Sequence, residues 1–233
     1  MASFFVSYHL IWHRFYRVII MKLILQGYSG KMGSIVHAYL KSKNHEFVQL
    51  LDQFNQDVSI EALINCDAII DFSNPKSSLR LFSYALKYHI PMIIGTTGFS
   101  KSELDYIKKE SKNANIAVYV VYNFLSSINV LKKTIKHLSK DSSLIYVTDK
   151  HHKSKVDQPS GTSLALVNGI NKNKLHFISK RVDFFAYEHV IEINNEFETI
   201  EITHRCYNKV GYAKGVEKAL SKINTFVGLK TSI

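Results

Sequence analysis

Cysteine and proline are scarce in this chain. Its 233 residues include only two cysteines, Cys66 and Cys206, and three prolines. Two isolated cysteines supply neither a disulfide framework nor the paired CxxC ligands of a zinc knuckle. The composition therefore favours a reducing compartment, and we expect a cytoplasmic protein.

Long apolar runs are also missing. Residues 1–20 are aromatic and apolar, but His13, Arg14 and Arg17 interrupt them, and no small-residue cleavage site follows. The uninterrupted part is too short to cross a bilayer and does not fit a secretory signal. We expect no membrane partner, and we interpret residues 1–20 as an extension outside a fold that begins at Met21.

Acidic residues are outnumbered by basic ones. The chain has 30 lysines and arginines against 19 aspartates and glutamates, which gives a formal net charge of +11. Such an excess of positive charge can promote binding to nucleic acid, to an anionic membrane or to small acidic ligands. The lysines are scattered rather than gathered in a stripe, and the sequence has no recognised nucleic-acid-binding motif. We therefore expect no nucleic-acid partner and assign part of the charge to an anionic substrate and cofactor.

From Met21 onward, short apolar runs alternate with segments of helical periodicity. The expected strands cover residues 22–26, 47–51, 68–70, 91–94 and 116–121. Apolar strands separated by amphipathic helices predict a parallel sheet covered on both faces. Such a sheet binds ligands at the carboxyl ends of its strands, where the glycine-rich turns of this chain lie.

Beyond Val121 the pattern changes. We expect a long helix over residues 125–138 and a final helix over residues 212–226. Extended stretches are expected at residues 145–147, 181–186, 189–193 and 197–204. The strict alternation in the last of these is typical of a half-exposed antiparallel strand. The predicted fold class is α/β, with a Rossmann-type parallel sheet followed by a second, α+β domain.

The first expected strand ends in a glycine-rich turn, Gly27 to Gly33. Glycines in such a turn let backbone N–H groups approach a pyrophosphate at the start of a helix. The match to G-x-G-x-x-G is imperfect, because Ser29 stands where the second glycine is usual. Asp52, at the end of the next strand, is suited to the ribose hydroxyls of an NAD-type cofactor. Without the turn, Asp52 would be interpreted as a solvated carboxylate.

The segment from His151 to Thr162 combines two imidazoles, a lysine and a helix start. An imidazole exchanges protons near neutral pH, and the Lys155 ammonium suits a carboxylate. Ser160 is expected to cap a helix whose first N–H groups bind anions. These residues predict chemistry on a small acidic molecule, although alone they also fit a solvated basic loop. We expect no metal site, because adjacent histidines on a loop rarely bind one ion.

Six motifs carry a resemblance to a known family. They are GYSGKMG, DFSNP, GTTGF, YNFLSSIN, HHKSKVDQPSGTSLAL and EITHRCYNKVGYAKG. In order and approximate spacing they resemble bacterial 4-hydroxy-tetrahydrodipicolinate reductase, also called dihydrodipicolinate reductase. The resemblance runs from Met21 to about Phe226, and HHKSKVDQPSGT is close to diagnostic of the family.

The resemblance implies an architecture and a reaction. A dinucleotide-binding domain would comprise residues 21–123 and about 208–233. A substrate-binding and oligomerisation domain would comprise residues 124–207 and use an open mixed sheet to build a homotetramer. The family reduces the cyclic product of dihydrodipicolinate synthase with NADH and/or NADPH. The reaction loses water and gives tetrahydrodipicolinate in the diaminopimelate route to lysine.

The resemblance also assigns site residues. His151 corresponds to the family's proton donor, and Lys155 to its catalytic partner. The small dicarboxylate substrate is expected at His152, Lys155, Gly161 and Thr162. The expected cofactor contacts are Gly27, Tyr28, Ser29, Gly30, Lys31, Met32, Asp52, Gly95, Thr96, Thr97, Val121, Tyr122, Asn123 and Phe124.

The chain departs from the family at several points. The segment between Asp52 and Asp71 is compressed, and the loop before Arg181 is short. Asp183 and Tyr187 stand where glycines are expected, and Lys209 replaces an arginine. These changes bear on loop closure and tetramer detail more than on the reaction. The alternative function, a non-catalytic Rossmann-type nucleotide-sensing protein, is disfavoured because the catalytic segment is intact.

The choice between NADH and NADPH stays open. Asp52 favours NADH, because a carboxylate repels the 2′-phosphate of NADPH. Lys31, inside the glycine turn, could accept that phosphate.

A chain that begins at Met21 should fold and keep full activity, because residues 1–20 fit neither a signal, nor a span, nor an element of the predicted fold. Thermal unfolding and reductase turnover of the truncated and full-length chains measure this. A large drop in melting temperature, or loss of solubility, would show that the extension is part of the core.

Overall fold

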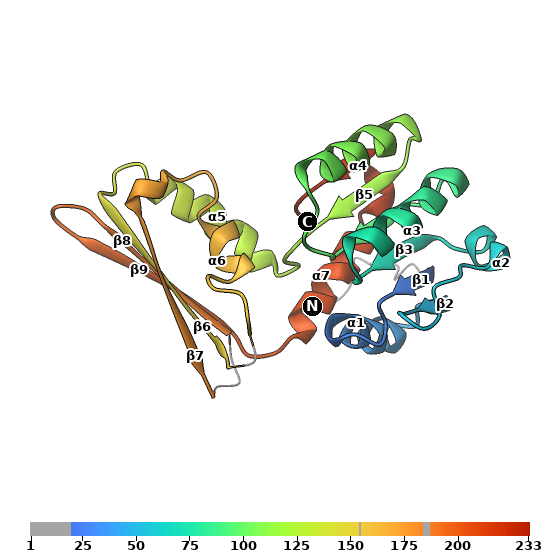
Figure 1. The fold of residues 1–233 in the computed structure, drawn as a ribbon, viewed down its shortest axis with the longest axis horizontal. Helices are drawn as coiled ribbons and strands as arrows, with labels where there is room; N and C mark the ends of the chain where they lie inside the picture. The colour runs from blue at the N-terminus through green and yellow to red at the C-terminus, as the bar shows by residue number, and fades with distance from the viewer. Residues whose placement is uncertain (1–19, 154, 184–186) are drawn as a thin grey trace, which may run out of the picture.

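The computed structural model describes residues 20–153, 155–183 and 187–233. Figure 1 shows two layered units: a parallel sheet between helices, and a longer twisted sheet with helices on one side. The predicted α/β class with a second, mixed-sheet unit is confirmed. Residues 1–19 of the predicted extension and residues 184–186 of an expected extended stretch lie outside the described residues.

The first sheet has six parallel strands in the order β10-β5-β4-β3-β1-β2. Five of them are the apolar runs predicted from the sequence. The strands are β1 (Lys22–Gln26), β2 (Glu46–Leu51), β3 (Ala68–Asp71), β4 (Met92–Ile94), β5 (Ala117–Val120) and β10 (Gly228–Lys230). All six carboxyl ends therefore meet at one edge, which is the Rossmann-type arrangement.

Helices cover both faces of this sheet, so its strands are apolar on both sides. Leu23 and Leu25 pack in a cluster with Val36 and Val216, whereas Ile24 between them packs in the opposite cluster with Phe82. The helices are α1 (Lys31–Ser42), α2 (Ile60–Ile64), α3 (Pro75–Tyr88), α4 (Lys101–Asn113) and α7 (Val210–Leu220). Within the described ranges, no helix has the length and apolar character to cross a bilayer.

Two elements of this unit were not predicted. Helix α2 has five residues and strand β10 has three, so neither is long enough to show a periodic pattern. The prediction that the final helix runs to residue 226 is wrong. Helix α7 ends at Leu220, a 3₁₀ turn (Ile223–Thr225) follows, and Gly228, with φ of +81°, leads into β10 beside β5.

The second sheet has four strands in the order β7-β6-β8-β9. β6 and β7 are parallel, and the other two pairs are antiparallel, so the sheet is mixed as predicted. Its strands are β6 (Leu144–His152), β7 (Leu175–Val182), β8 (Tyr187–Asn194) and β9 (Thr199–Cys206). The connections include α5 (Ser126–Leu138), α6 (Gly161–Leu166) and a 3₁₀ turn (Lys172–Lys174).

The helices among the described residues lie on only one face of this sheet (Figure 1). On that face Ile145 and Val147 of β6 and Ile191 of β8 pack against Ile135 and Leu166 from α5 and α6. Along β9, exposed and half-buried residues alternate up to the end of the strand, as expected for a strand with one covered face. The opposite face of the sheet is therefore open, as the family resemblance implied.

Candidate functional site

The glycine turn joins β1 to α1 at the carboxyl edge of the parallel sheet. Gly27 has φ of +79°, and a Cβ there would lie 2.3 Å from the carbonyl oxygen of Phe72. A Cβ on Gly33 would lie 2.0 Å from the carbonyl oxygen of Gly27. Gly30 precedes α1 without a side-chain cap, and the first turn of α1 has no acid. The first N–H groups of α1 are thus left for an anionic ligand.

A cavity of about 230 Å³ lies at this turn, and four of the predicted cofactor residues line it: Gly27, Ser29, Gly30 and Asp52. The Asp52 carboxylate accepts hydrogen bonds from the backbone N–H groups of Phe54 (2.9 Å) and Asn55 (3.1 Å). The bond from Phe54 contributes most to lowering the pKa of Asp52. Asp52 is therefore an anion at neutral pH, in the position that suits ribose hydroxyls.

Seven further residues line the same cavity and were not predicted: Gln26, Gln53, Gln56, Phe72, Ser73, Asn74 and Ser77. Several belong to the DFSNP motif, which the sequence places at a strand end. The signal that could have found them is strand order, because β3 lies directly beside β1. Of the other predicted contacts in the turn, Lys31 is exposed, and the Tyr28 ring stands edge-on to His37 at 6.4 Å.

Asp71, at the end of β3, holds the neighbouring strand ends together. It is completely buried, and its Oδ2 accepts a hydrogen bond of 2.6 Å from Thr96 Oγ1. Thr96 Oγ1 in turn accepts the backbone N–H of Ser73 at 2.9 Å. Burial raises the pKa of Asp71. The network fixes Thr96 beside the glycine-turn cavity, whereas Thr97 is exposed.

The remaining predicted cofactor residues follow β4 and β5. A Cβ on Gly95 would lie 2.1 Å from the ring of Phe72, and the Phe72 and Phe124 rings are 5.7 Å apart. Val121 is buried in the core and Tyr122 is half exposed. Gly95 and Phe124 thus both contact or approach Phe72, one of the residues that line the glycine-turn cavity.

His151 lies on strand β6, not in the loop that the sequence predicted, because β6 continues to His152. The His151 side chain is buried, with Nδ1 3.0 Å from Asp149 Oδ1. Its ring is 5.3 Å from the Tyr187 ring and 5.4 Å from the His189 ring. Burial lowers the pKa of His151, and the Asp149 carboxylate opposes that effect. His152 is exposed at the end of the strand.

Asp149 is a site residue that sequence reasoning missed. Its carboxylate is completely buried and lies on the same side of β6 as His151, two residues away. Oδ1 also accepts from Arg181 Nη1 at 2.8 Å, and Oδ2 accepts from Ser179 Oγ at 2.9 Å and the Ser160 N–H at 3.1 Å. The available signal was the D-x-H spacing directly after the strand expected at residues 145–147.

Lys155 stands in the loop after β6. Its Nζ donates to Asp157 Oδ1 at 2.8 Å, and its carbonyl oxygen accepts Arg181 Nε at 3.1 Å. Arg181 also donates to the carbonyl oxygen of Asp157. A single side chain therefore attaches the loop that carries Lys155 to the carboxylate that contacts His151.

The predicted helix start at Ser160 is confirmed. Ser160 Oγ accepts the N–H of Ser163 at 3.1 Å, and α6 begins at Gly161. Thr162 Oγ1 accepts a hydrogen bond of 3.2 Å from Asn123 Nδ2. Asn123 was predicted on the cofactor side and Thr162 on the substrate side, so this hydrogen bond joins one residue of each set.

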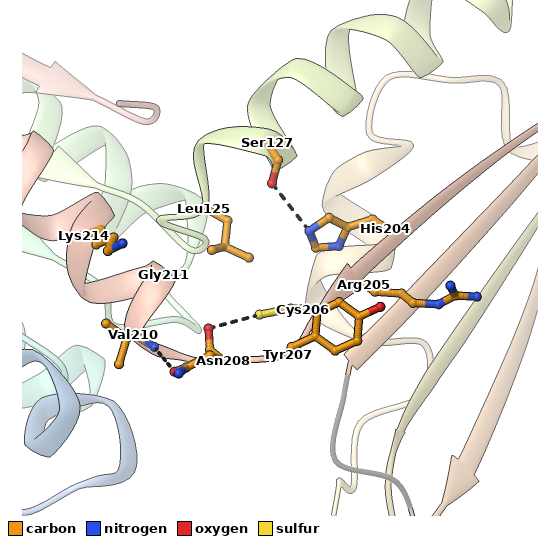
Figure 2. A pocket seen from close by; sticks show the side chains of 10 residues that line it. All are labelled: Leu125, Ser127, His204, Arg205, Cys206, Tyr207, Asn208, Val210, Gly211 and Lys214. Atoms are coloured by element: carbon orange, nitrogen blue, oxygen red, sulfur yellow. Dashed lines mark hydrogen bonds between the residues drawn. The ribbon is translucent and has the colours of Figure 1, made fainter.

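A second cavity, of about 430 Å³, lies where the chain returns from β9 to α7 (Figure 2). His204 lies in its wall, with Nε2 3.5 Å from Ser127 Oγ and Nδ1 3.5 Å from His189 Nδ1. The cavity is larger than the one at the glycine turn, but none of the predicted site residues lines it. It lies between Leu125 and Gly211, where the chain passes between the two sheets.

Among residues 20–153, 155–183 and 187–233, no group of three histidine, cysteine or acidic side chains is placed to hold a metal ion.

Comparison with protein families gives two matches that together span the fold. The model described as "Dihydrodipicolinate reductase, N-terminus" matches residues 21–124, and the one described as "Dihydrodipicolinate reductase, C-terminus" matches residues 127–232. The 4-hydroxy-tetrahydrodipicolinate reductase of Clostridium tetani is 32% identical over 233 residues, covering 86% of this chain and 91% of the relative. That of Thermosipho africanus is 31% identical, covering 85% and 89%.

Solved structures agree on the fold. A dipicolinate-bound dihydrodipicolinate reductase from Paenisporosarcina has a TM-score of 0.76 at 19% identity, covering 92% of this chain and 98% of that one. An amine dehydrogenase from Mycobacterium smegmatis has a TM-score of 0.62 at 7% identity, covering 91% and 94%.

Proposed function

The chain belongs to the dihydrodipicolinate reductase family, and we infer that it reduces 4-hydroxy-tetrahydrodipicolinate to tetrahydrodipicolinate with loss of water, in lysine biosynthesis by the diaminopimelate pathway. It is a nicotinamide-dependent oxidoreductase. The observation that carries this function is that both family models match, over residues 21–124 and 127–232, with the segment from His151 to Thr162 complete. A non-catalytic nucleotide sensor would have no use for that segment.

The glycine turn fits a nicotinamide dinucleotide. A Cβ on Gly27 or Gly33 would collide with the backbone of Phe72 or of Gly27, so these glycines keep the turn tight. The tight turn leaves the first N–H groups of α1 for a pyrophosphate. Asp52 would hold the ribose, and Gly95, Thr96, Asn123 and Phe124 would surround the nicotinamide end. When bound, the reduced nicotinamide supplies the hydride. Residues of this chain must then orient the substrate and supply the proton.

We assign the role of proton donor to His151. Reduction of a conjugated imine develops negative charge on the substrate, and a positioned acid neutralises it. His151 is buried at the end of β6, close to the Lys155 loop and to the start of α6. Lys155, His152 and the first N–H groups of α6 at Gly161 and Thr162 would hold the two substrate carboxylates. Holding them fixes the distance from substrate to acid.

The open face of the second sheet supports a homotetramer. It is a continuous β surface that no helix of the described residues covers, and on it Lys150 and Arg205, both partly exposed, pair with the buried carboxylate of Glu188. Copies of the chain packed through this face would cover it. We place the enzyme in the cytoplasm, because its two cysteines are not paired.

The wild-type chain should turn over freshly made synthase product with a nicotinamide cofactor. His151→Gln should lower turnover by about 10²- to 10⁴-fold with little change in cofactor affinity, because it removes an acid used mainly in the transition state. Absorbance of the reduced cofactor measures both. Near-normal turnover of the variant would exclude His151 as the proton donor, and an inactive wild type would exclude the reaction.

NADH should be the better cofactor, with NADPH also accepted. The Asp52 carboxylate repels a 2′-phosphate, while exposed Lys31 offsets part of that repulsion. Asp52→Asn should therefore bring the kcat/KM values for the two cofactors closer together, and Lys31→Ala should lower kcat/KM for NADPH alone. If Lys31→Ala lowers kcat/KM equally for NADH and NADPH, this role of Lys31 is wrong.

Pyridine-2,6-dicarboxylate, a planar dicarboxylate, should inhibit competitively against substrate. Lys155→Ala should weaken this inhibition by about tenfold or more, since a charge-assisted hydrogen bond contributes about 1.5–3 kcal/mol. NADH binding, followed by fluorescence, should barely change, because the glycine turn is a separate site. If the variant loses NADH affinity and keeps dicarboxylate inhibition, Lys155 serves the nucleotide instead.

A further inference from the structure

The Asp149 carboxylate, which contacts the His151 ring, is held rigidly. Asp149 uses both oxygens: Oδ1 faces His151 and Arg181, while Oδ2 faces Ser179 and the Ser160 N–H. Donors on both oxygens prevent the carboxylate from rotating about its Cβ–Cγ bond. The contact with His151 Nδ1 therefore has one geometry, which is set by strands β6 and β7 and by the start of α6.

We propose that Asp149 is the positioning residue for proton donation. It holds Nδ1–H of His151, so that the second proton of the imidazolium stands on Nε2, the nitrogen left to reach the substrate. This proposal rests on the proposed function, in which His151 is the acid. A neutral imidazole with its proton on Nδ1 has none on Nε2, so it cannot donate there. The donor must be the cation, and Asp149 is the group that favours it.

The surroundings of His151 make this contribution decisive. Lys155 and Arg181 disfavour a second positive charge, and burial disfavours it further. Burial lowers the pKa of neighbouring His189 to about 4, so that ring is neutral at neutral pH. The Tyr187 ring also packs against His151. Among the described groups that act on His151, Asp149 is the one that raises its pKa.

Turnover should depend on pH through the protonation of His151. The imidazolium loses its proton as pH rises through the pKa of His151, so turnover should fall on the alkaline side. Without the Asp149 carboxylate the pKa of His151 falls further, and the alkaline limb of the kcat profile should move to lower pH.

Asp149→Asn should lower kcat at pH 7 by about tenfold to a hundredfold and shift that limb to lower pH. KM and NADH affinity should change by less than about threefold. The matched control is Asp183→Asn, which removes the same charge from an exposed side chain paired with Lys153, and should keep the wild-type profile. Asp149→Glu, which retains a carboxylate, should bring the limb back toward its wild-type position. An unmoved limb in the asparagine variant overturns the proposal.

Nitrogen NMR of the wild-type imidazoles provides a test that needs neither turnover nor a stable Asp149 variant. The His151 signal is identified by its absence from His151→Gln. Its neutral form should carry the proton on Nδ1; a neutral form protonated on Nε2 refutes the positioning role. This measurement does not depend on turnover, so it distinguishes two failures. If the proposed reaction is wrong, the wild type is inactive but His151 still carries its proton on Nδ1. If the positioning role is wrong, the neutral ring carries its proton on Nε2.

Discussion

The proposed substrate side of the site depends on the hydrogen bonds that the buried carboxylate of Asp149 accepts. A carboxylate removed from water is costly unless donors satisfy it, and Asp149 receives them from β6, β7 and the start of α6. Burial raises its pKa, but the hydrogen bonds from Arg181, Ser160, Ser179 and His151 together lower it more, so it is ionised at neutral pH. Its charge fixes Arg181, and Arg181 attaches the loop that carries Lys155.

The cofactor side uses a second buried carboxylate for a different purpose. Asp71 ends β3, and its donors are the hydroxyl groups of Ser73 and Thr96 rather than a cation. Burial accordingly raises the pKa of Asp71, whereas the pKa of Asp149, paired with Arg181, is lowered. In each unit one buried acid joins neighbouring segments, but only Asp149 is matched with a charged partner and contacts the proposed proton donor.

Local patterns were sufficient to predict five strands of the Rossmann-type sheet and the Ser160 cap. In the second sheet most of β7 (Leu175–Val182) was missed, because the expected extended stretch covered residues 181–186. The three-residue β10 escaped prediction, since its strand character comes from pairing with β5. The family motifs named His151 and Lys155 but not Asp149 or Arg181, whose roles depend on β6 lying parallel to β7. Phe72 and Ser73 likewise line the glycine-turn cavity only because β3 lies beside β1.

The two units of the fold meet where the chain crosses from β5 to α5. Asn123, at the crossing from β5 to α5, donates to Thr162 at the start of α6. Gly215 of α7 packs so tightly that a Cβ would lie 1.9 Å from the Phe124 carbonyl oxygen. The crossing therefore contacts both units, since Leu125 next to it packs against the core of the second one. The glycine-turn cavity is built entirely from the first unit, so the Asn123–Thr162 contact can change without altering the lining of that cavity.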